Sequence, residues 1–347
     1  MSLVIVNSAV DSLYFYYKGE AVEGFFENLE DLKEQAKTRE EKVPTKIGEE
    51  ELVISPFGAR MFRYLLSGRN FSLKVSPSAM LPNLMFQMLA ECLYQEGHQA
   101  AFERADRVAA EIGMKDDAKL SRIDLCVDFQ GWVPSEDRQN DFVCRANQEV
   151  TWRTGKSATG FQFGKGQILA RIYNKTAESI VHNKGWMEAV WCENPAYNEK
   201  EPVWRLEFQF RGKALKEFGA GTVIEAFSKL KGLWEYGLGW LSLRAGEESR
   251  LERRPIDPAW AALGQANFPG RSCERVKATK GLGSMERTLA MMLGYSSTLG
   301  ALVRIESMED VLRWAMPEME FICRQQGRSF ADRVKKKIAL QEQGEMW

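Results

Sequence analysis

Three short segments of the chain alternate apolar and polar residues, and this period of two is typical of a β-strand with one buried face. They span residues 122–129, 170–175 and 203–210. Their polar faces carry arginines, carboxylates, a lysine and a tyrosine: Arg122, Asp124 and Asp128 on the first segment, Arg171, Tyr173 and Lys175 on the second, and Arg205 and Glu207 on the third. If the three segments are strands of one sheet, these polar faces converge on a single surface. We take that surface as the candidate functional site.

The rest of the chain mixes further short strands with helices. Strands are expected at 3–6, 12–17, 53–54, 61–66 and 71–75, and helices at 83–97, 99–112, 175–181 and 221–231. The first of these helices is predicted from apolar residues at helical spacing, namely Leu84, Met88, Leu89 and Leu93. Residues 183–201 are expected to form an inserted loop. The mixture predicts an α+β fold with a largely antiparallel sheet and helices packed on one face.

Strand signals fade after about residue 245, and helical patterns dominate from there on. We therefore divide the chain into residues 1–243, which hold the candidate site, and residues 244–347, a mostly helical region. Cations gather in the second region, but acidic residues stand among them. Such a mixture is also typical of a solvated surface whose charges pair with one another.

Composition narrows the class of protein. The 347 residues are 44% hydrophobic and 27% charged, with a formal net charge of −1, so the chain is not strongly basic overall. No apolar run reaches the length of a membrane-spanning helix, and the six scattered cysteines are typical of reduced thiols. We expect a cytoplasmic protein without membrane association. The two histidines, His98 and His182, stand far apart, so any metal would need carboxylate ligands.

Tyr173 lies between two cations on its predicted strand. Side chains two residues apart on a strand share a face at a distance of about 7 Å, so Arg171 and Lys175 flank the phenol. A phenol with a pKa of about 10 is a poor nucleophile unless neighbouring cations favour the phenolate. The same cations can hold a phosphate. The pattern indicates attack of Tyr173 on a phosphodiester, which would leave a phosphotyrosine link.

Asp124, Asp128 and Glu207 supply the oxygen ligands that Mg²⁺ and Mn²⁺ prefer. The two aspartates lie about 13 Å apart along a regular strand, so they bind one ion together only if the strand bulges. A simpler arrangement joins Glu207 with one aspartate, preferably Asp124. The other aspartate then orients Arg205 or Arg122.

The order of these motifs resembles that of a known family. The chain reads Arg122-Ile-Asp124-Leu-Cys-Val-Asp128, then Arg171-Ile-Tyr173-Asn-Lys175-Thr-Ala-Glu178, then Trp204-Arg205-Leu-Glu207-Phe. This succession is similar to the rolling-circle replication initiators of the Rep_trans type, which occur on plasmids, in filamentous phages and as relaxases of integrative elements. The resemblance covers residues 120–215, and residues 10–13 look like the family's first strand. Family members often carry a Gly-Ser turn before the tyrosine strand, where this chain has Gly164-Lys165-Gly166.

The resemblance implies a function for each motif. Tyr173 would nick one DNA strand at an origin and keep the 5′ end as a phosphotyrosine, with Arg171 and Lys175 at the scissile phosphate. The carboxylates would form an acidic cluster for Mg²⁺ or Mn²⁺. Single-stranded or hairpin DNA, a host helicase and a second copy of the chain are the implied partners, in a bacterial cytoplasm. Arg122 and Arg205 are expected DNA contacts. In the C-terminal region, which the resemblance does not cover, charge alone makes a set of cations candidates for binding duplex DNA: Arg253, Arg254, Arg271, Arg275 and Lys277.

Other interpretations fit the same residues. A conjugative relaxase uses the same nicking chemistry. A DNA-binding regulator on this fold would bind an origin without cleaving it, and a nuclease would activate water instead of Tyr173. Cross-strand ion pairs in an unrelated α+β protein give the same local patterns. Three aromatic residues near the motifs are expected in the core: Trp152, Phe161 and Trp204.

Overall fold

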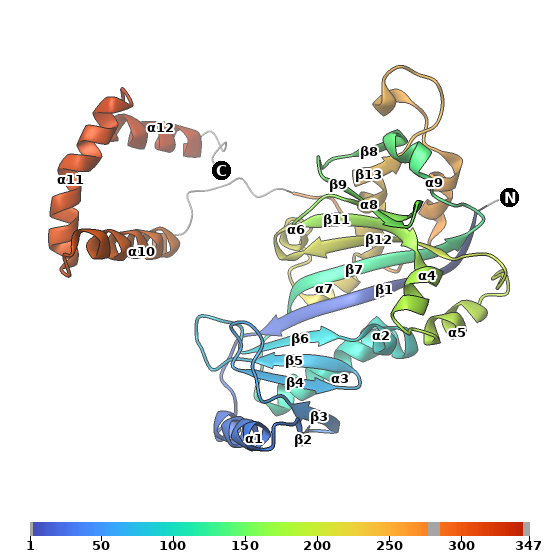
Figure 1. Cartoon of the computed structure of the whole chain (residues 1–347), viewed down its shortest axis with the longest axis horizontal. Coiled ribbons are helices and arrows are strands. Elements are labelled where there is room, and N and C mark those ends of the chain that lie inside the picture. The colour runs from blue at the N-terminus through green and yellow to red at the C-terminus, as the bar shows by residue number, and fades with distance from the viewer. Residues whose placement is uncertain (1–2, 277–284, 343–347) are drawn as a thin grey trace. The chain divides into compact units, whose positions relative to one another are not determined.

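One antiparallel sheet of 11 strands dominates the part of the chain that the computed structural model describes, residues 3–276 and 285–342 (Figure 1). In spatial order the strands are β2 (Val43–Ile47), β3 (Glu50–Ile54), β4 (Tyr64–Gly68), β5 (Phe71–Val75), β6 (Leu84–Met88), β1 (Val4–Tyr17), β7 (Lys119–Gln130), β12 (Trp204–Arg211), β11 (Ile168–Asn174), β10 (Ser157–Phe163) and β9 (Glu149–Thr154). The three alternating segments of the sequence are therefore adjacent strands, β7, β12 and β11.

Helices cover mainly one face of this sheet. Phe15 on β1 packs against Phe102, and Phe208 on β12 packs against Trp234, with ring centroids 5.2 Å apart in both pairs. The helices that contribute buried residues to this core are α2 (Ala90–Glu96), α3 (His98–Glu111), α6 (Gly212–Glu217), α7 (Val223–Phe227) and α8 (Leu230–Trp240), with α1 (Phe25–Arg39) beside β2 and β3. The predicted α+β class, with a largely antiparallel sheet, is confirmed.

The opposite face is covered at one end by a helix that the sequence did not predict. The segment expected to be a loop, residues 183–201, contains α5 (Trp186–Cys192), which follows α4 (Lys175–Val181). Met187 and Trp191 of α5 form a small second core with Val6 and Val203. A helix of 7 residues shows too few turns for its period to stand out in the sequence.

β1 is one strand of 14 residues where the sequence predicts two separate strands. It pairs with β7 along its length, with register shifts that interrupt the ladder. One shift lies between Val10 and Ser12, so Asp11 sits in a β-bulge. A bulge adds one unpaired residue and re-aims its side chain, and this lets the strand continue past the interruption.

The helix predicted over residues 83–97 begins too early. Residues Leu84–Met88 form β6, and α2 starts only at Ala90. Leu84, Phe86 and Met88 are buried while the residues between them are half-buried, which is a period of two. Leu84 and Met88 also stand four residues apart and thus satisfy a helical period, which explains the error. Phe86 stacks on Phe15 of β1, at 5.2 Å between ring centroids.

Residues 244–276 belong to the sheet-containing unit, although the sequence assigned them to the C-terminal region. The chain separates into two compact units, residues 1–276 and 277–347. The first unit includes a two-stranded sheet of β8 (Phe142–Cys144) and β13 (Leu241–Leu243), and α9 (Pro258–Ala262) follows it. Trp260 of α9 is 2% exposed and packs against Phe142, at 5.7 Å between ring centroids. The unit also has three 3₁₀ turns: η1 (Glu136–Asp141), η2 (Leu251–Arg253) and η3 (Leu263–Gln265).

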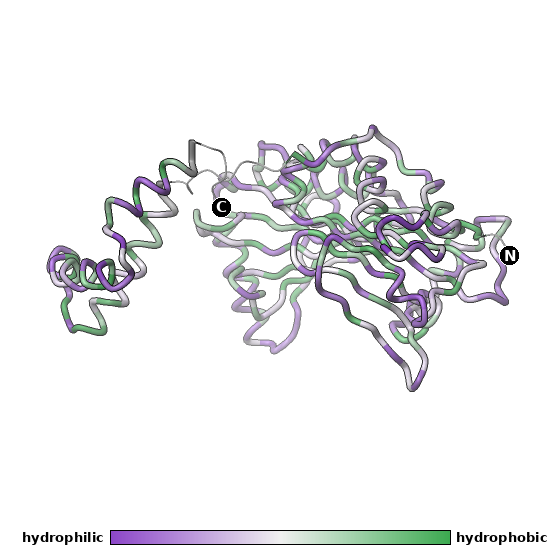
Figure 2. The backbone as a smooth tube through the Cα atoms, turned by 90° about the horizontal axis from the view of Figure 1, so that it is seen from above, coloured by the Kyte–Doolittle hydropathy of each residue, from purple (hydrophilic) through white to green (hydrophobic). Residues whose placement is uncertain are grey.

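The second unit, taken by itself, is helical, as predicted. Its described elements are α10 (Met285–Val303), α11 (Met308–Gln325) and α12 (Phe330–Glu342). Hydrophobic and hydrophilic residues alternate along these helices (Figure 2). Among the residues that the structure describes, a helix pair, Thr288–Val303 with Met308–Gln325, has the length and composition of a membrane span but is bent by 85°, and no single helix meets that test.

Candidate active site

The register of the three predicted strands lines up their polar side chains in rows across the sheet. Tyr173 on β11 lies opposite Arg205 on β12, which in turn lies opposite Asp128 on β7. In the next row, Arg171 lies opposite Glu207. Directly opposite residues of an antiparallel pair point to the same face, with Cβ atoms about 4.5–5.5 Å apart. The structure therefore brings the predicted nucleophile together with its flanking arginine and a carboxylate.

Glu207 holds the hydroxyl of Tyr173. The phenol donates a hydrogen bond of 3.2 Å to Oε2 of Glu207, and Arg171 donates one of 2.6 Å to Oε1 of the same carboxylate. Burial raises the pKa of the Tyr173 phenol well above its usual value, and the negative charge of Glu207 raises it further. Tyr173 is therefore a neutral hydroxyl at neutral pH whose proton already faces an acceptor.

Lys175 lies beside the ring of Tyr173. Its Nζ stands 5.7 Å from the ring centroid and donates a hydrogen bond of 2.6 Å to Glu178. Burial lowers the pKa of Lys175, and the nearby charge of Arg205 adds to this effect. Lys175 is the first residue of α4, where the strand ends because the side chain of Asn174 caps the helix by accepting from the backbone N–H of Ala177.

Asp128 and Arg205 form a buried ion pair beneath the site. Both side chains are fully buried, and Nε and Nη2 of Arg205 donate to Asp128 at 2.6 and 2.8 Å. Nε1 of Trp191 donates to the same carboxylate at 2.8 Å. Arg205 also pairs with Asp11. The carboxylate of Asp128 is thus occupied by protein donors, and Arg205, an expected DNA contact, does not reach the surface.

Three residues of this network were absent from the sequence-based site. Asp11 comes from the bulge of β1, Tyr94 from α2 and Trp191 from α5. The hydroxyl of Tyr94 donates to Asp11 at 3.1 Å and lies 3.0 Å from Sγ of Cys126. Asp11 carried a weak sequence signal, as a lone carboxylate inside a β-rich segment. Tyr94 and Trp191 carried none, because their positions depend on helix packing.

Asp124 is a fully buried carboxylate paired with a partly exposed arginine. Arg122 donates to it through Nε, at 2.8 Å, and through Nη2. Burial nevertheless raises the pKa of Asp124 to about 7, and the negative charges of Glu207 and Asp11 contribute to the rise. Burial is therefore the main reason that Asp124 holds its proton to higher pH than an exposed carboxylate, although Arg122 favours the charged form.

The three predicted metal ligands do not form one ligand set. Glu207 lies opposite Cys126, between the positions of Asp124 and Asp128 along β7. Within residues 3–276 and 285–342, no group of three or more histidine, cysteine or acidic side chains is arranged to hold a metal ion. Asp124 and Glu207 influence each other electrostatically, whereas Asp128 is committed to Arg205 and Trp191.

Trp152, expected in the core, is only partly buried and lies on the same sheet face as Tyr173, two strands away. It stands on the edge strand β9 opposite Gly160 on β10, which lies opposite Tyr173 on β11. A methyl group at Gly160 would lie 2.6 Å from Cβ of Tyr173 and 3.0 Å from Cε3 of Trp152. The glycine thus allows β10 to approach Tyr173, and the indole of Trp152 extends over it toward the tyrosine.

The predicted basic patch is divided by intramolecular contacts. Arg275 donates to Glu217 at 2.7 Å, and Arg254 pairs with Asp141 at 3.3 Å. Arg253 and Arg271 are exposed. All four belong to the sheet-containing unit, and Lys277 lies outside the described residues.

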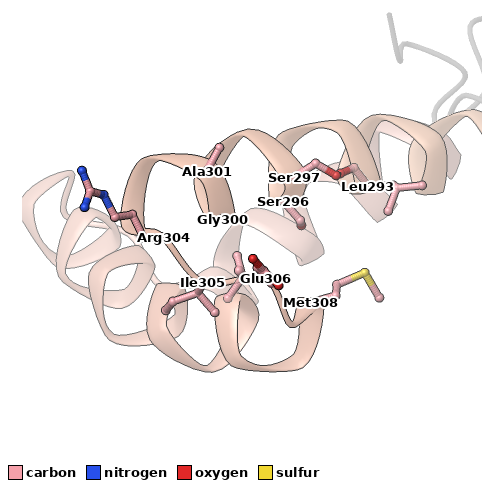
Figure 3. A pocket seen from close by; sticks show the side chains of 10 residues that line it. Leu293, Ser296, Ser297, Gly300, Ala301, Arg304, Ile305, Glu306 and Met308 are labelled. Atoms are coloured by element: carbon pink, nitrogen blue, oxygen red, sulfur yellow. The ribbon is translucent and has the colours of Figure 1, made fainter.

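A separate pocket belongs to the helical unit. It lies between α10 and α11 and is lined mostly by small and apolar side chains, with Arg304 and Glu306 among them (Figure 3). None of the predicted catalytic or metal-binding residues lines this pocket. The tyrosine site therefore lies on a sheet face of the first unit, independent of this cavity.

Comparison with known proteins gives distant similarities. No protein-family model matches the chain. It is 25% identical over 166 aligned positions to an uncharacterized protein, ORF430, of Pseudomonas phage Pf1, and the match covers 38% of this chain and 39% of the phage protein. A solved structure of a rolling-circle replication initiator from Geobacillus stearothermophilus superposes with a TM-score of 0.46 and 16% identity, over 76% of this chain and 96% of that one. Similarities at this level leave the function to be argued from the site itself.

Proposed function

We propose that the protein initiates rolling-circle replication by nicking one DNA strand through Tyr173. The observation that carries this proposal is the phenol of Tyr173, which donates a hydrogen bond of 3.2 Å to Glu207 on a partly exposed sheet face. Arg171 and Lys175 stand on either side of it. A hydroxyl with an acceptor for its proton and cations for a phosphate has the parts that a tyrosine nucleophile needs.

The proposed reaction is a transesterification. The oxygen of Tyr173 attacks the phosphorus, its proton moves to Glu207, and the bond between phosphorus and the 3′ oxygen breaks. The leaving oxygen takes a proton from water and becomes a 3′-hydroxyl, while the 5′ phosphate stays esterified to the tyrosine. The raised pKa of the phenol keeps it protonated before DNA binds. Proton transfer to Glu207 in the attack is then what activates it.

The cations beside Tyr173 are suited to a phosphate. Arg171 is partly exposed and presents a planar fork of donors. Lys175, whose side chain is only 3% exposed, places its charge over the ring of Tyr173 rather than at the surface. In the structure both are paired with carboxylates, Glu207 and Glu178. A phosphate at Tyr173 would share Arg171 with Glu207 through a direct contact, while the buried Lys175 would add to the positive potential there.

Of the predicted metal ligands, Asp124 and Glu207 fit a hard divalent cation. Their chemistry is right, because both are carboxylates, and the negative charge of Glu207 adds to the rise in the pKa of Asp124, which burial mainly causes. All three carboxylates accept from protein donors, but Asp128 fits least, since its donors Arg205 and Trp191 are buried. Asp124 and Glu207 pair instead with the partly exposed Arg122 and Arg171. When bound, Mg²⁺ or Mn²⁺ would polarise the phosphoryl oxygens of the DNA.

The DNA partner in this proposal is single-stranded or extruded as a hairpin. An open sheet face suits a strand whose phosphates and bases are both accessible. Initiation in a cell would also involve a host helicase and a second copy of the chain. The test below uses excess protein, so that a second copy is available. A conjugative relaxase would use the same residues for the same step.

The test is a covalent-trapping assay with the full chain. Single-stranded oligonucleotides that tile the replicon encoding the protein are labelled at their 3′ ends, incubated with Mn²⁺ and the protein, and separated on a denaturing gel. The expected result is a protease-sensitive, shifted band that is absent with Tyr173→Phe.

Each other result would replace the proposal with a different one. Cleavage without a shifted band indicates a nuclease that activates water. A shifted band that persists in Tyr173→Phe assigns the nucleophile to another residue. Binding without cleavage or adduct indicates a DNA-binding regulator.

A further inference from the structure

We propose that Trp152 is a stacking platform for an unpaired base of the DNA strand held at Tyr173. This inference rests on the proposed function and adds to it the form of the substrate, a single strand with at least one base free to stack. Base–aromatic stacking needs a flat side chain that is fixed in place, open on one side and close to the phosphate contacts. Trp152 is partly exposed, lies on the Tyr173 face of β9 and packs over Gly160.

The edge strand that carries Trp152 is anchored from its other face. Thr151 donates a hydrogen bond of 2.9 Å to Gln139, and Arg153 donates one of 3.3 Å to Glu136. Successive residues of a strand point to opposite faces, so these contacts lie on the face of β9 opposite to that of Trp152. On the face of Trp152, Val150 is 45% exposed and Trp152 itself is partly exposed.

The spacing suits a nucleotide. Tyr173 and Trp152 lie two strands apart, which is about 10 Å at the usual separation of neighbouring strands. The indole itself covers part of this distance, because it lies over Gly160, which has no side chain to exclude it, and its Cε3 is 3.0 Å from where a methyl group at Gly160 would lie. A strand with its phosphate at Tyr173 and Arg171 can therefore place a base over the indole.

A purely structural role for Trp152 makes a different prediction. Aromatic side chains often cover a glycine on the neighbouring strand, and Trp152 does cover Gly160. Leucine would also cover the glycine with apolar surface but cannot stack on a base. Phenylalanine retains both properties. Replacement of Trp152 by leucine and by phenylalanine therefore separates base binding from packing.

The experiment measures binding by fluorescence anisotropy in a Tyr173→Phe background, so that cleavage does not interfere. The probes are labelled oligothymidylate and an abasic sugar-phosphate strand of the same length, which has the charges but no bases. We expect Trp152→Leu to weaken binding of oligothymidylate by about 5- to 150-fold and to leave binding of the abasic strand unchanged. Trp152→Phe should retain most of the affinity for oligothymidylate.

The matched control is Phe57→Leu. Phe57 is an aromatic residue, 74% exposed, between β3 and β4 near the other end of the sheet, and its replacement should affect neither probe. The inference is overturned if Trp152→Leu weakens both probes equally or neither, or if Trp152→Phe behaves like Trp152→Leu. Thermal unfolding shows whether each variant still folds. If Trp152→Leu does not fold, Trp152→Phe decides the test. The inference is then overturned if Trp152→Phe no longer binds oligothymidylate more tightly than the abasic strand.

Failure of this inference differs from failure of the proposed function. If the Tyr173 adduct forms in the trapping assay but the preference for bases does not depend on Trp152, then nicking stands and stacking does not. If the preference depends on Trp152 but no adduct forms, then the face binds single strands without cutting them.

Discussion

Replacement of Arg205 by methionine should be among the most destabilising substitutions on this face of the sheet. Arg205 and Asp128 are both fully buried, and removal of the arginine would leave a buried carboxylate without its cation. Such a change costs about 3–5 kcal/mol, because desolvation of the remaining charge is no longer compensated. This is a large part of the stability of an ordinary domain, which is about 5–15 kcal/mol.

The interaction itself is measured by a double-mutant cycle. Asp128→Asn removes the buried charge, while the amide oxygen can still accept from Trp191. We expect Arg205→Met with Asp128→Asn to lose less stability than the two single variants added together, with a coupling of about 0.5–3 kcal/mol. Urea unfolding followed by circular dichroism gives each free energy.

An exposed ion pair provides the control. Arg313 and Glu309 are 70% and 79% exposed at their 2.7 Å contact on α11, so Arg313→Met should change the free energy of unfolding by about 0.5 kcal/mol or less. Additive losses for Arg205 and Asp128 would refute the reasoning. So would loss of Mn²⁺-dependent nicking in Asp128→Asn with unchanged stability, since that result would make Asp128 a metal ligand after all.

Two further predictions concern Gly160 and Asp124. Gly160→Ala would place a methyl group 2.6 Å from Cβ of Tyr173. The resulting displacement of Tyr173 should slow single-turnover nicking by about 100-fold while DNA affinity changes little. Equal losses of rate and affinity would contradict this. The pKa of Asp124 is raised from 3.8 to about 7, so the unfolded chain releases this proton at lower pH than the folded one. With a chelator present, the contribution of Asp124 to stability should fall as pH rises from about 4 to about 7, by roughly 4 kcal/mol in all. The difference in urea stability between the wild type and Asp124→Asn should change with pH accordingly, and a difference that does not depend on pH would contradict this.

The residues of the site could be predicted where a local period decides their direction. Alternation along β7, β11 and β12 placed Asp124, Tyr173 and Glu207 on polar faces, and the structure agrees because a strand's side chains follow from its period alone. Their meeting on one surface depends on strand order and register, which the sequence suggested only through the succession of motifs. The antiparallel sheet itself was predicted from the mixture of short strands with helices along the chain.

Contacts between distant segments could not be predicted in this way. Asp11 joins the site because β1 bulges at that residue, and Trp191 joins it because α5 packs across Val6 and Val203. Neither fact is visible in the period of the segment concerned. The helix predicted at Leu84–Met88 was wrong for a related reason. The apolar residues of this segment satisfy both the helical and the strand period, and pairing with β1 selects the strand.

The pairing of charges on this face bears on how the proposed reaction would be triggered. Arg171 is paired with Glu207, Arg122 with Asp124, and Lys175 with Glu178, so without DNA each cation already has a carboxylate partner. A phosphate that draws Arg171 toward itself leaves Glu207 less neutralised, and Glu207 then becomes a stronger acceptor for the proton of the tyrosine. The same withdrawal strengthens the attraction of Glu207 and Asp124 for a divalent cation. Because binding free energies are reciprocal, a cation bound there would in turn favour the phosphate. On this argument, the ion pairs that make the face resemble an ordinary structural surface are what would keep Tyr173 inactive until a DNA strand is in place.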